Sequence, residues 1–174
     1  MAIKKILTEP DPFLRQKSEK VENVNEEIRS LMDDMLDTMY DAPGIGLAAI
    51  QIGIPKRVIV IDLSKEKEKK NPLYLVNPEI ITKSNNDTSY EEGCLSVPNQ
   101  FAEISRPDKC KVKFLDYDGN ERILEADGLL ATCIQHEMDH LEGILFIDYL
   151  SKLKKSMIVK KLSKQKKNLE RIVV

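Results

Sequence analysis

Apolar residues recur at helical spacing between residues 25 and 41. They share one face of the predicted helix, which is formed by Ile28, Leu31, Met32, Met35, Leu36 and Met39. Asn25 is placed to cap the first turn, and Gly44 follows the end of the pattern. The pattern therefore predicts an amphipathic helix with one buried face.

Two further helices are predicted in the last third of the chain. One begins at Asp127, as its N-terminal cap, runs through His140 and ends at Gly143, a residue type that often stops helices. Beyond Tyr149, apolar residues are interspersed among lysines, which predicts a basic C-terminal helix.

Short apolar runs or strict alternation predict strands at residues 58–61, 73–81, 109–115 and 122–124. Pro78 should interrupt the second of these, and Asp118-Gly119 provides a hairpin turn between the last two. Polar residues predict loops at 64–71 and 84–89. Helices and strands do not alternate regularly, so we expect an α+β fold with mixed or antiparallel strands packed around a central helix.

The charge is distributed unevenly along the chain. The 174 residues carry a net charge of −2 and fit a single domain, residues 1–174. Residues 151–174 contain eight Lys, one Arg and one acidic residue, a net charge of +8, so residues 1–150 carry −10. We therefore expect an acidic body, residues 1–150, followed by a basic helix.

The first residues lack the apolar run of a signal peptide, and no segment approaches the roughly 20 apolar residues that span a bilayer. Three cysteines are an odd number, which argues against a disulfide framework. We expect a cytoplasmic protein with neither DNA nor a membrane as partner.

The only two histidines lie in one pentapeptide, His136-Glu137-Met138-Asp139-His140. On a helix, residues four apart share a face, so both imidazoles can bind one metal while Glu137 reaches a water beside it. The alternative is an ordinary exposed helix. A catalytic site needs a third ligand, and Phe146 stands where the longer histidine motif would supply one.

The cysteines differ as candidates for the third ligand. Cys110 alternates inward on a strand and is best explained by packing, and Cys133 lies about 10 Å of helix axis from His140. Cys94 lies in an irregular Gly- and Pro-flanked segment of the kind that carries functional groups. We therefore predict Cys94 as the thiolate ligand.

Gly44-x-Gly46-x-x-Ala49 matches a dinucleotide-binding fingerprint. That fingerprint follows a strand, however, whereas this segment follows a predicted helix. The glycines can instead let the backbone approach a substrate, with Gln51 placing an amide where an oxyanion forms. A tight turn with an exposed Gln51 is the other interpretation.

Three segments together resemble the peptide deformylase family: residues 44–51, residues 92–96 and residues 135–140. The resemblance implies that Cys94, His136 and His140 hold one Fe²⁺, for which Zn²⁺, Ni²⁺ or Co²⁺ can substitute. It implies hydrolysis of the formyl group from N-terminal formyl-methionine of new proteins, with Glu137 as general base and acid. Gln51 and the Leu95 backbone N–H would stabilise the oxyanion.

The resemblance also implies a slot for the methionine side chain, lined by Ile45, Gly46, Tyr90, Leu129, Thr132 and Cys133. Core packing is the alternative for Leu129 and Cys133. Arg106 matches a basic position of the family and is expected to pair with Glu92 as a support. Phe101 stands where many bacterial members carry a basic residue.

The basic tail has two interpretations, a solvated helix face or a surface that docks on ribosomal RNA near emerging chains. For the whole protein, the alternatives to a deformylase are a small zinc endopeptidase and a structural metal or RNA-binding protein. The endopeptidase lacks a third His or Glu ligand, and a closed structural site lacks a fourth ligand.

Overall fold

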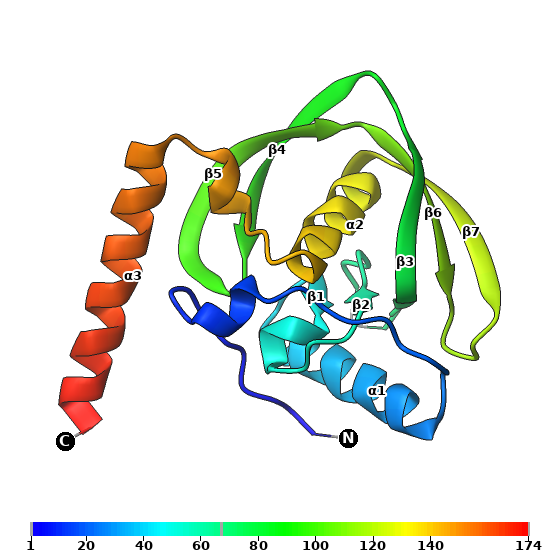
Figure 1. The fold of residues 1–174 in the computed structure, drawn as a ribbon, viewed down its shortest axis with the longest axis horizontal. Coiled ribbons are helices and arrows are strands. Elements are labelled where there is room, and N and C mark those ends of the chain that lie inside the picture. Colours follow the sequence, from blue (N-terminus) through cyan, green and yellow to red (C-terminus); the bar gives the residue numbers. More distant parts are fainter. Residues whose placement is uncertain (1, 67, 174) are drawn as a thin grey trace.

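A computed structural model describes residues 2–66 and 68–173, apart from the side chains of 169–173. In this structure two antiparallel sheets enclose a helix. The larger sheet has the order β1-β2-β3-β6-β7 and consists of Gly46–Ala48, Val58–Ile61, Leu73–Lys83, Lys109–Leu115 and Glu121–Asp127 (Figure 1). The smaller sheet pairs β4, Asp87–Cys94, with β5, Val97–Pro107.

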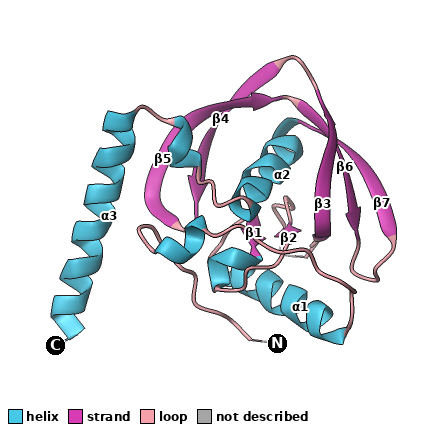
Figure 2. Cartoon of the chain, in the orientation of Figure 1, coloured by secondary structure: helices cyan, strands magenta, loops and turns pink. Residues whose placement is uncertain are grey.

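The helices are α1, Glu26–Asp41, α2, Gly128–Leu141, and α3, Lys152–Val173 (Figure 2). Short 3-10 helices lie at Pro12–Arg15, before α1, at Ala49–Ile52, between β1 and β2, and at Phe146–Tyr149, between α2 and α3. Helix α2 lies between the two sheets, and α1 packs against β1 and β2. None of the helices in the described part of the chain has the length and apolar run needed to cross a bilayer.

The predicted α+β class with a central helix is confirmed. The first helix begins after Asn25, whose side chain accepts a hydrogen bond from the Ile28 N–H at 3.1 Å. One face of that helix is buried with Val58 and Val60 of β2, as its apolar spacing predicts.

Three local predictions are wrong. Residues 87–89 belong to β4, so the loop predicted at 84–89 is shorter. Pro78 does not end its strand, because Asn77 takes a positive φ of 51° and the register shifts between Val76 and Glu79. Asp127 occupies the N-cap position of α2 without a capping hydrogen bond, because it still pairs with Lys109 as the last residue of β7.

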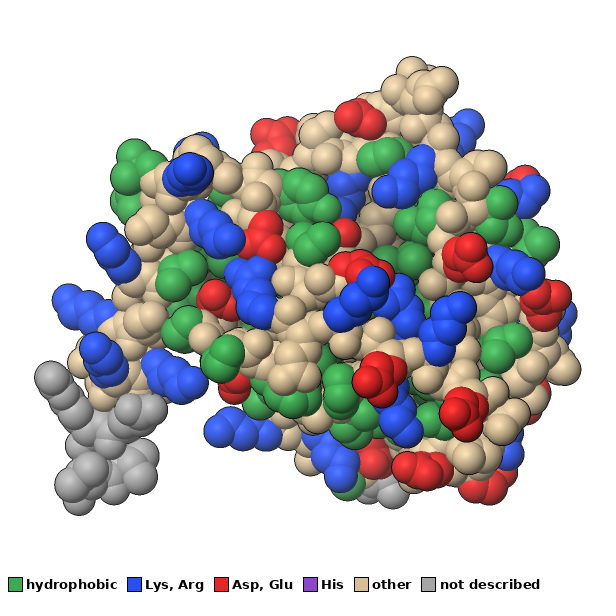
Figure 3. Space-filling model, viewed as in Figure 1, with side chains coloured by type: hydrophobic (Ala, Val, Ile, Leu, Met, Phe, Trp, Pro, Cys, Tyr) green, Lys and Arg blue, Asp and Glu red, His purple; other side chains and the backbone are tan. Residues whose placement is uncertain are grey.

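Helix α3 is anchored to the body by apolar side chains on one face. Leu162 is 4 % exposed and packs with Ile158 and Val159 against Val97 of β5 and Phe146. The exposed face of α3 carries lysines along the edge of the molecule (Figure 3). The basic tail is therefore both a structural element and a charged surface.

Candidate active site

Helix α2 buries the paired histidines at the centre of the molecule. His136, Glu137 and His140 are 9 %, 5 % and 1 % exposed, so the interpretation as an ordinary exposed helix is wrong. The two imidazole rings lie 5.2 Å apart between centroids, as one helical turn requires. Burial lowers the pKa of His140 well below its usual value, which keeps that ring in the neutral form able to bind a metal.

The strand β4 ends at Cys94 and brings its thiol to this helix. Cys94 Sγ lies 3.3 Å from His140 Nε2, and the donor atoms of Cys94, His136 and His140 all lie within 4.8 Å of one another. Sulfur and imidazole nitrogen suit iron, zinc and similar transition metals. Three converging, largely buried donors therefore fit one such ion.

The segment around Cys94, predicted as irregular, is the end of a strand followed by a two-residue turn. Cys94 pairs with Val97 at the tip of a β-hairpin, with a register shift after Glu92. Strand pairing at this tip holds the thiol in place, which suits a metal ligand better than a mobile loop would.

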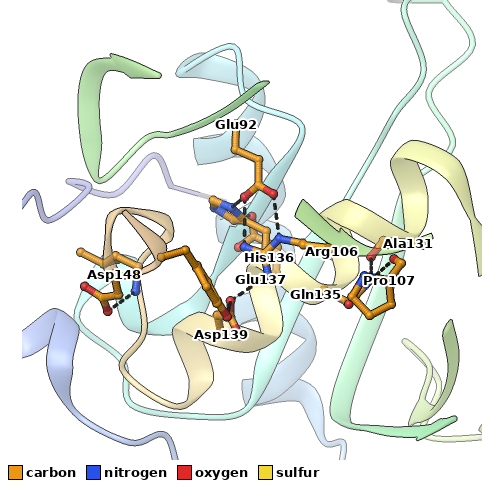
Figure 4. Close-up of polar contacts among 11 residues, drawn as sticks. Glu92, Arg106, Pro107, Ala131, Gln135, His136, Glu137, Asp139 and Asp148 are labelled. Atoms are coloured by element: carbon orange, nitrogen blue, oxygen red, sulfur yellow. Dashed lines mark hydrogen bonds and ion pairs between the residues drawn. The ribbon is translucent and has the colours of Figure 1, made fainter. Parts of the chain in front are cut away.

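Glu92, on β4, connects the metal-ligand cluster to a buried arginine. Its carboxylate lies 2.8 Å from His136 Nδ1 and accepts hydrogen bonds from Arg106 Nε at 2.7 Å and Nη2 at 3.0 Å (Figure 4). Burial alone would raise the pKa of Glu92, but the bonds from His136 and Arg106 hold it below its usual value. The contact to Nδ1 leaves His136 Nε2 as the nitrogen that faces Cys94.

Arg106 also donates to Asp139 at 2.9 Å, and the Tyr149 hydroxyl donates to the same carboxylate oxygen at 2.7 Å. Glu92 and Arg106 lie together as the resemblance implied, whereas Asp139 and Tyr149 were not predicted from the sequence. Asp139 stands inside the histidine pentapeptide, one residue before His140, and this position is the one sequence feature that pointed to it.

Glu137 projects from α2 toward β1. A Cβ on Gly46 would lie 2.6 Å from Glu137 Oε1, so any other residue at this position would displace the carboxylate from where it lies. Burial raises the pKa of Glu137 to about 7, and its Oε2 has no hydrogen-bond partner among the described residues. A carboxyl group with a pKa near neutrality can both accept and return a proton.

Gln51 is buried beside Cys94, so the exposed-turn interpretation of this residue is wrong. Its Nε2 lies 3.7 Å from Cys94 Sγ and donates to Ser96 Oγ at 2.9 Å. Ser96 was not predicted, although it stands two residues after the cysteine. Leu95, whose backbone N–H was the second predicted donor, lies with Ser96 in the turn between Cys94 and Val97.

A cavity of about 460 Å³ opens over this cluster. The residues predicted for the methionine slot all line it, namely Ile45, Gly46, Tyr90, Leu129, Thr132 and Cys133. Leu129 is 42 % exposed, so core packing does not explain it. Cys133 is buried and lies in both the core and the cavity wall, and burial raises the pKa of its thiol to about 12.

Phe101 forms part of the cavity rim. Its ring lies against Gly93, where a Cβ would come within 2.6 Å of the ring, and the residue is 65 % exposed. The rim at this point is therefore aromatic and uncharged.

Comparison with known proteins gives consistent matches. The sequence profile of the family described as polypeptide deformylase matches residues 3–156. The peptide deformylase of Pelagibacter ubique (strain HTCC1062) is 69 % identical over 174 residues, which is 100 % of both chains. The peptide deformylase of Rhizobium meliloti (strain 1021) is 55 % identical and covers 96 % of each chain.

Solved structures agree with the sequence matches. The crystal structure of peptide deformylase from Ehrlichia chaffeensis in complex with actinonin superposes with a TM-score of 0.91 and 44 % identity, covering 95 % of this chain and 98 % of that chain. A peptide deformylase from Legionella pneumophila superposes with a TM-score of 0.89 and 46 % identity, over 98 % and 99 % of the two chains.

Proposed function

Because the chain belongs to the peptide deformylase family, we propose a role for each side chain of its site in the reaction of that family. The chain is a metal-dependent hydrolase that removes the formyl group from N-formyl-methionine of newly made proteins. One observation supports the proposed roles: Cys94, His136 and His140 converge, and Cys94, His136 and Glu137 line a cavity.

Cys94 Sγ and the two imidazoles would hold one divalent metal ion per chain, which we propose to be Fe²⁺, with Zn²⁺, Ni²⁺ or Co²⁺ able to substitute. Such an ion supplies Lewis acidity and lowers the pKa of water toward neutrality. Glu92 orients His136 through Nδ1, so the ligand ring is fixed before the ion arrives.

Glu137 carries the proton in this reaction. Its carboxylate accepts a proton from the water that attacks the formyl carbon and donates it to the departing amine nitrogen, which yields formate and a free N-terminus. The pKa of about 7 suits both halves of this transfer.

Gln51 Nε2 and the Leu95 backbone N–H would donate to the formyl oxygen as negative charge develops on it. The methionine side chain would enter the slot formed by the cavity residues given above. Apolar side chains such as Ile45 and Leu129 favour an unbranched thioether there. Since the substrate emerges where translation occurs, we propose the cytoplasm as the site of action.

Formate release is the direct test. The protein is purified without oxygen, its metal is quantified, and formyl-Met peptides are supplied together with peptides that a zinc endopeptidase would cut internally. We expect formate release without chain cleavage, dependent on about one metal ion per chain and lost when a chelator removes it. Chain cleavage without formate would select the endopeptidase, and full activity in the metal-free protein would refute the proposed metal site.

We further propose that the exposed lysines of α3 contact ribosomal RNA. Replacing Lys160 and Lys164 with glutamate should weaken ribosome binding and reduce its dependence on salt, because fewer phosphate contacts release fewer counterions. Cosedimentation at several salt concentrations measures this effect, and hydrolysis of short formyl peptides should be unchanged.

The matched control places the same charge change at Lys20 and Lys109, which are exposed on the body. Equal ribosome binding by both double variants and the unaltered protein would show that α3 is only a solvated face. Charge reversal is a cleaner test than truncation after Leu150, because truncation would expose the apolar cluster that Leu162 covers.

A further inference from the structure

The side-chain amide of Gln51 is held at both ends. Its Oε1 accepts a hydrogen bond from the Ala48 N–H at 2.9 Å, and its Nε2 donates to Ser96 Oγ at 2.9 Å. Gln51 is 1 % exposed and Ser96 is fully buried, so water does not compete for these bonds. The bond to Ala48 also determines which end of the amide carries the two N–H groups.

The amide nitrogen of Gln51 carries two hydrogens, and one of them forms the hydrogen bond to Ser96 Oγ. Nε2 lies 3.7 Å from Cys94 Sγ, so its second N–H is directed toward the thiol and the two imidazoles beside it. Ser96 therefore fixes the rotation of the amide such that the N–H directed at Cys94 Sγ also faces the position where the formyl oxygen is expected.

The N-terminal segment aligns the backbones of the two partners. The Leu7 N–H donates to Gln51 O at 2.7 Å, and two residues later the Glu9 N–H donates to Ser96 O at 2.8 Å. One extended segment thus fixes the 3-10 helix that carries Gln51 against the hairpin tip that carries Ser96. The contact between the side chains is built into the fold at three points.

We propose that Ser96 is a positioning residue for the reaction: its hydroxyl aims the Gln51 N–H at the formyl oxygen, an inference that rests on the role proposed for Gln51. Without the hydroxyl, the buried Nε2 loses its oxygen acceptor, and rotation about the broad terminal torsion of the side chain is no longer restricted. Ser96 itself contacts neither the substrate nor the metal ligands in this scheme.

A double-mutant cycle tests the inference in the metal-loaded enzyme. We expect Ser96→Ala to lower kcat about tenfold with little change in KM, since the misdirected donor matters most in the transition state. Gln51→Ala should lower kcat by about 10²–10³. The double variant should match Gln51→Ala alone, because Ser96 acts only through that amide.

The control is Ser105→Ala, which removes an exposed hydroxyl from β5, in the same hairpin, and should leave kcat unchanged. Metal content and the midpoint of urea unfolding are measured for every variant. If Ser96→Ala lowers kcat by the same factor in the unaltered protein and in the Gln51→Ala variant, the positioning role of Ser96 is overturned while the role of Gln51 stands. A loss of kcat that only parallels a loss of metal or of stability would also overturn the positioning role. An unchanged kcat in Gln51→Ala would instead overturn the role proposed for Gln51.

Discussion

Replacing Glu137 with glutamine should lower kcat for formate release by about two to four orders of magnitude, the usual contribution of a general acid and base. Glutamine fills the same space between α2 and Gly46, so the cavity keeps its shape. It cannot accept and return a proton, and the other carboxylate that contacts His136, that of Glu92, is already bonded by Arg106. Steady-state formate release with metal analysis on the same sample measures the effect.

The control for this variant is Glu103→Gln, an exposed carboxylate on β5, which should keep full activity. We expect the Glu137 variant to bind metal as the unaltered protein does, because its carboxylate is not part of the ligand cluster. More than a tenth of the original kcat in the fully loaded variant would remove Glu137 from the proton transfer. Loss of metal would instead assign it a role in binding the ion.

Helical spacing identified the parts of the site that lie on one element. His136, Glu137 and His140 follow one another on α2, and their proximity follows from the rise and turn of a helix. Cys94 was reached by excluding the other two cysteines, yet its strand was taken as irregular. Most of β4 and β5 outside the hairpin tip alternates between intermediate and exposed positions, so apolar alternation is too weak there to signal strands.

The remainder of the site depends on contacts between distant parts of the chain. Ser96 meets Gln51 across 45 residues, and Arg106 meets Asp139 across 33. No local periodicity encodes such pairs, because they result from how the hairpin β4-β5 packs against the 3-10 helix Ala49–Ile52 and against α2. Sequence reasoning therefore predicted the three side chains that converge here and missed those that contact them, apart from the pair of Glu92 and Arg106 that the family resemblance supplied.

Removing the charge of Arg106 should have the largest effect on stability. Arg106 is 5 % exposed and bonds both Glu92 and Asp139, so Arg106→Met leaves two carboxylates without their cation, one of them buried against His136. Breaking a buried ion pair from one side costs about 3–5 kcal/mol of unfolding free energy. We also expect metal affinity to fall about 10–100-fold, because Glu92 no longer orients the His136 ring correctly.

Arg122→Met is the matched control, since Arg122 bonds Asp116 with 62 % of its side chain exposed and such surface pairs contribute about 0–1 kcal/mol. Urea unfolding of the metal-free proteins measures the free energy of unfolding without a contribution from metal binding. Metal affinity is measured separately, by competition with a chelator. If both variants lose the same small amount of stability, the buried network contributes no more than a surface pair. If stability falls and metal affinity is unchanged, the role of Arg106 is limited to folding. If both fall, one buried cation supports both the β4-β5 hairpin and the orientation of His136.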